Sequence, residues 1–206
     1  MYIVGDIGNT ETKICLFNNK KKLLSKKILS TNKLKNFTLK KKFNYLKPYA
    51  EKIKLAIFSS VVPQTYKILK IFLKKNFKIK TKEIKQFNLK KILKIDVNMK
   101  QIGSDRIANA IGIIDYKNNF IVLDFGTATT FDVVVKDCYK GGIIAPGVKL
   151  SLNTLSSKAK LIPSIKLSKA KNIIGKNTQN AVKSGFYWGY QGLIENIINM
   201  IERETK

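Results

Sequence analysis

The sequence predicts an α/β protein made of two related lobes, each with a mixed β-sheet flanked by helices. Two observations support this class. Each half of the chain opens with short apolar, β-prone runs separated by glycine or asparagine turns, and helical patterns follow. In addition, one short motif occurs twice, as IVGDIGNTET at residues 3–12 and as IVLDFGTATTFD at residues 121–132.

The repeated motif has an aspartate, a glycine two residues later and a threonine six residues later. Setting one copy on the other superposes Asp6 on Asp124, Gly8 on Gly126 and Thr12 on Thr130. An apolar run that ends in a carboxylate and a glycine turn is typical of a β-hairpin with polar groups at its bend. Two such turns predict two lobes that face one ligand, with residues 1–114 in the first lobe and 115–206 in the second.

The first lobe is predicted to begin with a three-stranded meander and to continue with alternating strands and helices. Pro63 is placed to open a helix, because proline fits the first helical position. Ser104 or Asp105 is placed to cap another. The expected elements are strands at 2–6, 12–17 and 23–30, a helix within 31–48, a strand at 52–59, a helix at 63–75, a strand at 77–84 and a helix at 104–116.

The second lobe repeats the meander and ends in a long helix. Its glycines at 185, 189 and 192 predict a close approach of another element on one side of that helix, and Thr178 is interpreted as its N-cap. The expected elements are strands at 120–124, 129–136 and 139–145, a helix from Pro146-Gly147 to about residue 159, and a helix at 178–204.

Composition favours a cytoplasmic protein. No apolar run approaches the roughly 18 residues of a membrane-spanning helix, and Gly5 and Asp6 interrupt the apolar core that a signal peptide needs. The two cysteines, Cys15 and Cys138, each lie in an apolar β-like run, which predicts buried reduced thiols instead of a disulfide or a metal site.

The formal net charge of +27 raises the question of a nucleic-acid partner. Only Arg106 and Arg203 of the forty basic residues are arginines, although arginine is the preferred residue for bidentate contacts with phosphates and bases. We therefore expect no specific nucleic-acid binding and no membrane partner. The charge predicts salt-sensitive adhesion to polyanions and attraction of an anionic substrate.

The sequence contains no histidine, so a general base must be a carboxylate, a lysine or a tyrosine. Asp105, in the stretch GSDR at Gly103–Arg106, is a candidate base for a hydroxyl nucleophile. Arg106 beside it supplies a planar, bidentate donor in a chain that otherwise uses lysine. The alternative reading is structural, because an aspartate at the start of a helix is common.

The first glycine turn has two readings as well. It can be an ordinary hairpin tip, since Asp, Gly and Asn are frequent turn residues. It can also bind a polyphosphate through backbone N–H groups and threonine hydroxyls, with Asp6 holding Mg²⁺ directly or through water and Lys13 adding a positive charge. The second copy, at Asp124–Thr130, strengthens the phosphate reading because two turns can contact a nucleotide from both sides.

Taken together, these motifs resemble the type III pantothenate kinases, members of the acetate kinase, sugar kinase, heat-shock chaperone and actin superfamily. The resemblance runs from Tyr2 to about Gly192. It rests on six motifs in the order of the family: DIGNTETK at 6–13, GSDR at 103–106, DFGTATTFD at 124–132, GGIIAPG at 141–147, LIP at 161–163, and GKNT with a later Ser-Gly at 175–185.

The resemblance implies two ribonuclease-H-like lobes with an ATP cleft between them, a homodimer, and ATP-dependent phosphorylation of pantothenate, the first step toward coenzyme A. It implies Asp105 as the proton acceptor, Mg²⁺ with ATP, and a monovalent cation, K⁺ or NH₄⁺, at Asp124. The implied ATP contacts are Asp6, Ile7, Gly8, Asn9, Thr10, Glu11, Thr12, Lys13 and Thr127. The implied pantothenate contacts are Gly103, Ser104, Asp105, Arg106 and Thr178.

Two departures from the family keep an alternative open. The family often has a tyrosine seven residues before the first glycine of the GSDR motif, where this chain has Asp96, and an added carboxylate should weaken the binding of a carboxylate substrate. Members also usually continue beyond the long helix. The alternative is a non-catalytic accessory or regulatory relative of the family.

Overall fold

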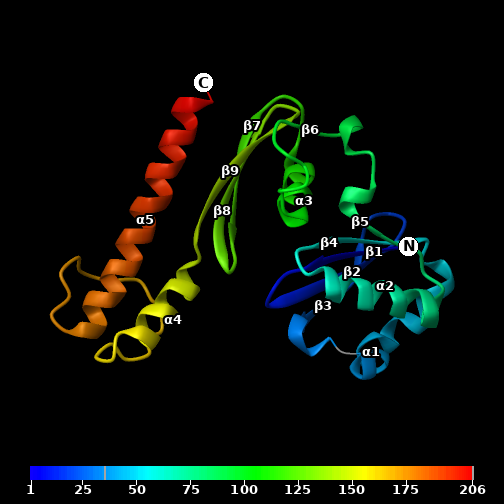
Figure 1. Ribbon diagram of the computed structural model, residues 1–206, viewed down its shortest axis with the longest axis horizontal. Coiled ribbons are helices and arrows are strands. Elements are labelled where there is room, and N and C mark those ends of the chain that lie inside the picture. The colour runs from blue at the N-terminus through cyan, green and yellow to red at the C-terminus, as the bar shows by residue number, and fades with distance from the viewer. Residues whose placement is uncertain (35, 206) are drawn as a thin grey trace. The chain divides into compact units, whose positions relative to one another are not determined.

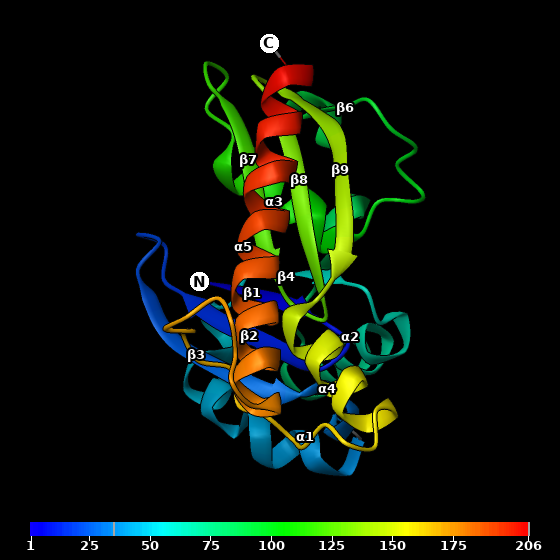
Figure 2. The same cartoon turned by 90° about the vertical axis from the view of Figure 1, so that its left-hand side faces the viewer.

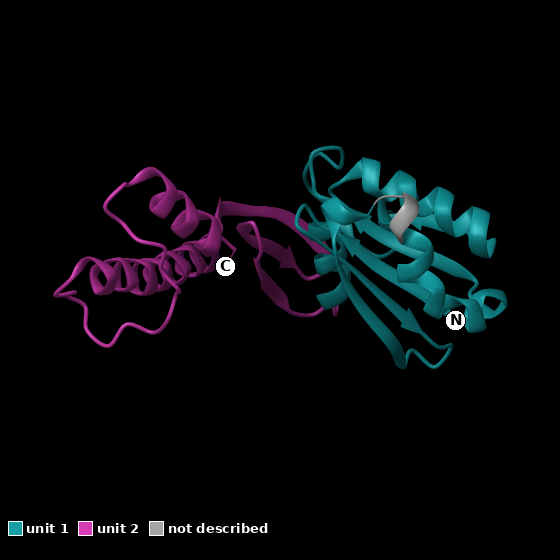
Figure 3. Ribbon diagram, turned by 90° about the horizontal axis from the view of Figure 1, so that it is seen from below, with its two compact units in different colours: residues 1–113 teal, residues 114–206 magenta. Residues whose placement is uncertain are grey.

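The computed structural model describes residues 1–34 and 36–205, which form two compact units, Met1–Ile113 and Ile114–Lys206 (Figure 3). Each unit has a β-sheet with helices packed against it, so the predicted α/β class is confirmed. In both units an antiparallel meander of three strands comes first along the chain. This order positions the two repeated motifs at the first hairpin of each unit.

The first unit is built on a five-stranded mixed sheet with the order β3-β2-β1-β4-β5 (Figure 1). β1 pairs antiparallel with β2 and parallel with β4, so β1 lies in the middle of the sheet. The strands are β1 (Tyr2–Ile7), β2 (Glu11–Phe17), β3 (Leu23–Ser30), β4 (Leu55–Ser60) and β5 (Thr81–Glu83).

Alternation along β1 and β2 decides which face of this sheet is covered. Ile3, Ile14 and Leu16 are fully buried and pack in one core with Leu69 and Leu73 of the helix that follows β4. Burying each such side chain contributes about 1.5–3 kcal/mol. The helices of the unit are α1 (Asn36–Phe43), α2 (Pro63–Phe77) and α3 (Ser104–Ile113).

Short elements fill the connections of the first unit. They are the 3₁₀ helices η1 (Thr31–Lys33), η2 (Asn44–Lys52), η3 (Ile84–Gln86) and η4 (Leu89–Lys91), and the two-residue strand β6 (Lys94–Ile95). The helix expected within 31–48 is therefore three successive short helices. The expected strand at 77–84 is mostly wrong: α2 extends to Phe77, and Lys78 then adopts a left-handed conformation with φ 56°, leaving only Thr81–Glu83 to pair with β4.

The second unit has the antiparallel meander β7 (Asn119–Phe125), β8 (Ala128–Val135) and β9 (Cys138–Pro146), followed by α4 (Val148–Lys158) and α5 (Thr178–Glu204). α5 lies along one face of these strands (Figure 2). Phe131 and Val133 of β8 form a core with Ile201 of α5. The repeat of the meander follows the sequence prediction, and α5 has the predicted bounds.

Two smaller expectations are wrong. Among the described residues, nothing lies within 4 Å of a β-carbon added at Gly185, Gly189 or Gly192, so these glycines support no close approach there. Cys15 and Cys138 are free thiols, as expected, but they are only half-buried. Separately, among the helices in the described residues none is both long and apolar enough to cross a bilayer.

Candidate functional site

The first repeated motif forms the hairpin turn between β1 and β2. The last pair of the ladder is Ile7 with Thr12, and the N–H of Gly8 donates to the carbonyl of Glu11 at 3.0 Å. This bond closes a loop of two residues, Asn9 and Thr10, both of which are exposed. The turn therefore presents its backbone and the Thr10 hydroxyl to solvent, as a phosphate-binding turn requires.

Asp6 precedes this turn and is half-buried. Ser59 of β4 donates a hydrogen bond to its Oδ1 at 2.8 Å, and the two residues are register partners in the parallel β1–β4 pair. Nothing in the spacing of the sequence singles out Ser59, because the contact depends on which strand lies beside β1. Ser59 holds one carboxylate oxygen of Asp6 and thereby restricts the orientation of this side chain.

Thr12 does not present its hydroxyl to solvent. Its side chain is fully buried, and its Oγ1 lies 2.9 Å from Oγ1 of Thr31, the residue that follows β3. The side-chain contact with phosphate that the sequence suggested for Thr12 is therefore replaced by a contact inside the protein. The exposed side chains of Asn9, Thr10, Glu11 and Lys13 can still reach a ligand.

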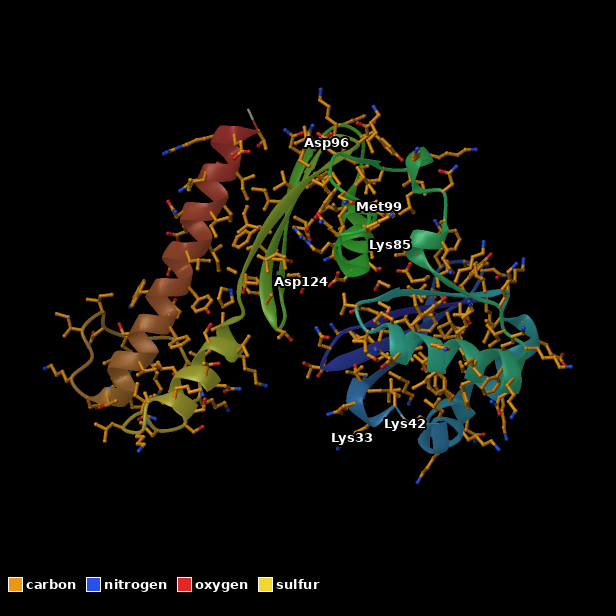
Figure 4. The ribbon with its side chains drawn as sticks, viewed as in Figure 1. Lys33, Lys42, Lys85, Asp96, Met99 and Asp124 are labelled. Carbon is orange, nitrogen blue, oxygen red and sulfur yellow. The ribbon has the colours of Figure 1, made fainter. Side chains whose placement is uncertain are left out.

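The second repeated motif forms the turn between β7 and β8. Its last ladder pair is Phe125 with Thr129, and the N–H of Gly126 donates to the carbonyl of Ala128 at 2.9 Å. This loop contains one residue, the exposed Thr127. Asp124 is exposed near the turn (Figure 4).

The two turns thus differ in length by one residue, which corrects the superposition made on the sequence. Asp6 pairs with Lys13, whereas Asp124 pairs with Thr130. The counterpart of Thr12 is accordingly Thr129, which is also fully buried, and not Thr130. The alignment of the two aspartates and of the two glycines agrees with the observed pairing.

A residue beyond the third strand contacts each turn. In the first unit the N–H of Thr31 donates to the carbonyl of Thr10 at 3.0 Å, and in the second the N–H of Gly147 donates to that of Thr127 at 3.1 Å. A β-carbon at Gly147 would overlap the Thr127 oxygen and lie 2.5 Å from the oxygen of Gly126. The second turn therefore requires glycine at the place where the first has threonine.

The candidate base lies at the start of α3. Asp105 is half-buried, and its Oδ1 accepts a hydrogen bond from the backbone N–H of Arg106 at 2.9 Å. The sequence predicts Ser104 or Asp105 as the N-cap of this helix. The helix begins at Ser104, and an N-cap residue precedes the first helical residue, so neither of them is the N-cap. α3 packs on β4, the strand whose Ser59 contacts Asp6, so the candidate base and the first turn belong to neighbouring elements of one unit.

Lys85 supports the approach to α3. Its Nζ donates to the backbone carbonyl of Ile102, directly before the GSDR motif, and Figure 4 shows this lysine beside α3. Ser104 is almost fully buried, whereas Gly103 and Arg106 are half-buried. Ser104 is therefore the member of the motif least accessible to a substrate.

Thr178, the remaining predicted substrate contact, belongs to the second unit and is exposed as the first residue of α5. It is not the N-cap. Asn177 has that role, since its Oδ1 accepts a hydrogen bond from the N–H of Asn180 at 2.9 Å. The Thr178 hydroxyl has no hydrogen bond within the described chain, which leaves it available to a ligand.

Asp6 and the exposed Glu11 are the carboxylates beside the first turn, and Asp124 lies beside the second. The described residues contain no group of three or more Cys, Asp or Glu side chains that could hold a metal by themselves. So few carboxylates fit Mg²⁺ that is bound chiefly by phosphates and water, since Mg²⁺ keeps much of its hydration in nucleotide sites. It also fits a monovalent cation shared with backbone oxygens.

Comparison with known proteins identifies relatives along the whole chain. A sequence model of the type III pantothenate kinase family matches residues 2–200. A type III pantothenate kinase of Pelagibacter ubique is 57% identical over 206 residues, which cover 100% of this chain and 83% of that protein. Another, from Sulfurihydrogenibium, is 38% identical over 215 residues and covers 100% and 84%.

A solved structure supports the fold. The crystal structure of a Campylobacter jejuni protein described as a Baf family transcriptional activator superposes with a TM-score of 0.57 and 20% identity, covering 95% of this chain and 78% of that one. At this identity the likeness concerns the fold alone.

Proposed function

The chain belongs to the type III pantothenate kinase family, and we propose that it phosphorylates pantothenate with ATP to give 4'-phosphopantothenate, the first step of coenzyme A biosynthesis. The family match over residues 2–200, together with 57% identity to a type III pantothenate kinase, carries this proposal. The reaction is the transfer of a phosphoryl group to an alcohol.

The first turn supplies the main contacts with the ATP phosphates in this proposal. Its exposed backbone at Asn9 and Thr10 offers N–H donors, and Lys13 adds a positive charge. Ile7, fully buried, and Glu11 contribute through the backbone, and Thr12 contributes by holding the turn. Thr127 at the tip of the second turn contributes a hydroxyl. The loops of both turns are short and exposed. This supports their assignment as phosphate contacts, because neither tip is covered by its own unit.

Asp105 is the proton acceptor in this proposal. Because Oδ1 accepts the N–H of Arg106, the carboxylate is fixed in orientation and Oδ2 remains to accept the proton of the primary hydroxyl of pantothenate. The hydroxyl oxygen then attacks the γ-phosphorus in line as the bond to ADP breaks. Gly103, Ser104, Arg106 and Thr178 complete the proposed contacts with pantothenate, with the guanidinium of Arg106 suited to its carboxylate.

Two cations are part of the proposal. Asp6 would hold Mg²⁺ directly or by way of water, and the ion would supply positive charge to the phosphates during transfer. K⁺ or NH₄⁺ is assigned to the exposed Asp124, and this assignment rests on the resemblance of the motif at 124–132. Ser59 orients Asp6 for its task by holding one oxygen of the carboxylate.

A coupled assay of ADP release tests the function. We expect release that depends on pantothenate and Mg²⁺ and that K⁺ stimulates. No release of ADP in the presence of pantothenate would instead indicate the non-catalytic accessory or regulatory relative, whereas release without pantothenate would indicate ATP hydrolysis that is not coupled to this substrate. We also propose that the protein is a cytoplasmic homodimer. Sedimentation velocity at high salt tests the dimer, because salt screens adhesion between highly charged molecules. A monomer under these conditions would contradict the proposed dimer.

The assignment of the base has its own test. Asp105→Asn keeps the shape and the acceptor oxygen of the side chain but removes its basicity, so kcat should fall by about 100-fold or more while KM for ATP changes little. Glu51→Gln, which neutralises an exposed carboxylate in η2, is the matched control and should leave kcat unchanged. A variant Asp105→Asn with near wild-type kcat would show that another group takes the proton.

A further inference from the structure

Thr31 belongs to none of the motifs found in the sequence, yet it makes several contacts with the first turn. It is the first residue of η1, directly after β3, is 5% exposed, and contacts Gly8, Thr10 and Thr12. Its Oγ1 donates to the carbonyl of Gly8 at 2.8 Å, and its N–H donates to the carbonyl of Thr10 at 3.0 Å. Thr31, at the end of the meander, thus binds the carbonyls on either side of Asn9.

The hydroxyl protons of this cluster can be assigned. A threonine hydroxyl has one proton to donate and two lone pairs to accept with. The proton of Thr31 Oγ1 is used on the carbonyl of Gly8, so in the 2.9 Å contact between the two hydroxyls Thr12 must be the donor. Thr12 supports Thr31, and Thr31 in turn holds the loop.

The two bonds from Thr31 orient two peptide groups. In a trans peptide the C=O of one residue and the N–H of the next point in opposite directions, and the described residues contain no cis peptide. Since the carbonyls of Gly8 and Thr10 point at Thr31, the N–H groups of Asn9 and Glu11 point away from it. Asn9 is exposed, so its N–H is directed at a place that a ligand can reach.

We propose that Thr31 is a positioning residue for ATP: its hydroxyl fixes the Gly8 peptide so that the N–H of Asn9 faces the nucleotide phosphates. The inference rests on the proposed function, because it takes the first turn to be the phosphate site. An oriented N–H needs no rearrangement when the anion binds, whereas a freely rotating peptide must be ordered first.

The test compares three variants by calorimetric ATP binding and by KM and kcat. Thr31→Val removes the hydroxyl at nearly constant volume, and Thr31→Ser keeps it. Thr81→Val is the matched control, because Thr81 is a 7% exposed threonine of the same unit whose Oγ1 has no hydrogen-bond partner in the described chain. Thr31→Val should weaken ATP binding and raise KM for ATP by about 10-fold.

The remaining variants separate positioning from general stability. Thr31→Ser should bind ATP within about 2-fold of the wild type, Thr81→Val should leave ATP binding unchanged, and KM for pantothenate should move in none of them. Equal ATP affinity of wild type and Thr31→Val would overturn the inference. If Thr31→Val does not fold, the same comparison is made with Thr31→Ala, and full affinity there would also overturn it.

The binding assay distinguishes this inference from the proposed function. A wild-type protein that binds ATP but does not phosphorylate pantothenate would contradict the function, while a loss of ATP affinity in Thr31→Val would still support the role of Thr31. A wild-type protein with pantothenate kinase activity and an unaltered Thr31→Val would contradict the role of Thr31 alone. A protein that binds no ATP would overturn both.

Discussion

The two glycine turns occupy the same place in the two meanders but are held in different ways. The first has two loop residues, and a threonine side chain spans from the end of β3 to the loop. The second has one loop residue, and the backbone at Gly147 lies so close to it that no side chain fits. Both turns have a backbone bond from the residue after the third strand to the loop carbonyl.

From this difference we propose a division of tasks between the turns. A loop held by side-chain hydroxyls can orient its N–H groups toward a ligand, as proposed for Asn9. A loop packed directly against backbone fixes the position of Thr127 instead, because the neighbouring chain allows little movement. The repeated motif therefore predicts a shared architecture, while the residues outside the motif decide how each turn is used.

Among the changes that test the comparison of the two turns, the largest effect should come from filling the close contact at the second turn. In Gly147→Ala the new β-carbon overlaps the Thr127 oxygen, so the loop or the start of α4 must shift. A displacement of about 1 Å in an active site can cost roughly 100-fold in rate, and we expect a loss of that order in kcat/KM for ATP. Steady-state kinetics together with the thermal unfolding midpoint would measure it.

Gly189→Ala is the matched control for this substitution. A β-carbon at Gly189 of α5 meets nothing within 4 Å, and alanine is favoured over glycine inside a helix by about 1 kcal/mol. The control should therefore keep its activity and unfold at an equal or higher temperature. Wild-type kinetics in Gly147→Ala would mean that the second turn tolerates displacement and that its close packing does not serve ATP binding.

Much of the fold could be predicted because it follows from local patterns. β3 and α5 have the predicted bounds, and β1, β2, β7, β8 and β9 differ by a residue or two, since alternating apolar residues and turn residues specify them directly. The strand expected at 77–84 is present only as the short β5, because its extent depends on pairing with β4 and on the left-handed Lys78, and neither is visible in a local pattern.

The site was predictable in its motifs but not in its supporting contacts. An equal spacing of six residues set Thr12 on Thr130, although the turns differ by one residue and Thr129 is the true counterpart. Ser59 and Thr31 lie 53 and 23 residues from the groups of Asp6 and Gly8 that they bind. Such contacts arise only when strands become neighbours, so a single sequence gives no signal for them.

A pair of carboxylate variants tests the division of tasks at smaller amplitude. Asp6→Asn should lower kcat by about 10- to 100-fold at every K⁺ concentration, because it weakens charge compensation at the phosphates. Asp124→Asn should instead abolish most of the stimulation by K⁺ and change the rate without K⁺ little. Titrating K⁺ against each variant at saturating ATP and Mg²⁺ measures both effects.

The same K⁺ titration can contradict the proposed division of tasks between the two turns. If the two variants lost K⁺ stimulation equally, the turns would share one cation site and would not have separate tasks. Ser59→Ala is a useful companion, because it removes the bond to Asp6 without changing charge and should reproduce a fraction of the Asp6→Asn effect. An unchanged Ser59→Ala would mean that the orientation of Asp6 does not limit the rate.

The smallest effect concerns the two buried threonines at equivalent places. Thr12 donates to Thr31, so Thr12→Val loses a hydrogen bond and should lower the free energy of unfolding by about 1 kcal/mol. The Oγ1 of Thr129 is buried and has no hydrogen-bond partner among the described residues, so Thr129→Val removes an uncompensated polar group and should be neutral or stabilising by up to ~1 kcal/mol. Urea unfolding of both variants, analysed for the midpoint at constant slope, gives the two values. Changes of opposite sign in the free energy of unfolding would support a first turn held by hydroxyls and a second held by backbone packing. An equal loss of this free energy in both variants would show that Thr129 has a polar partner in solution.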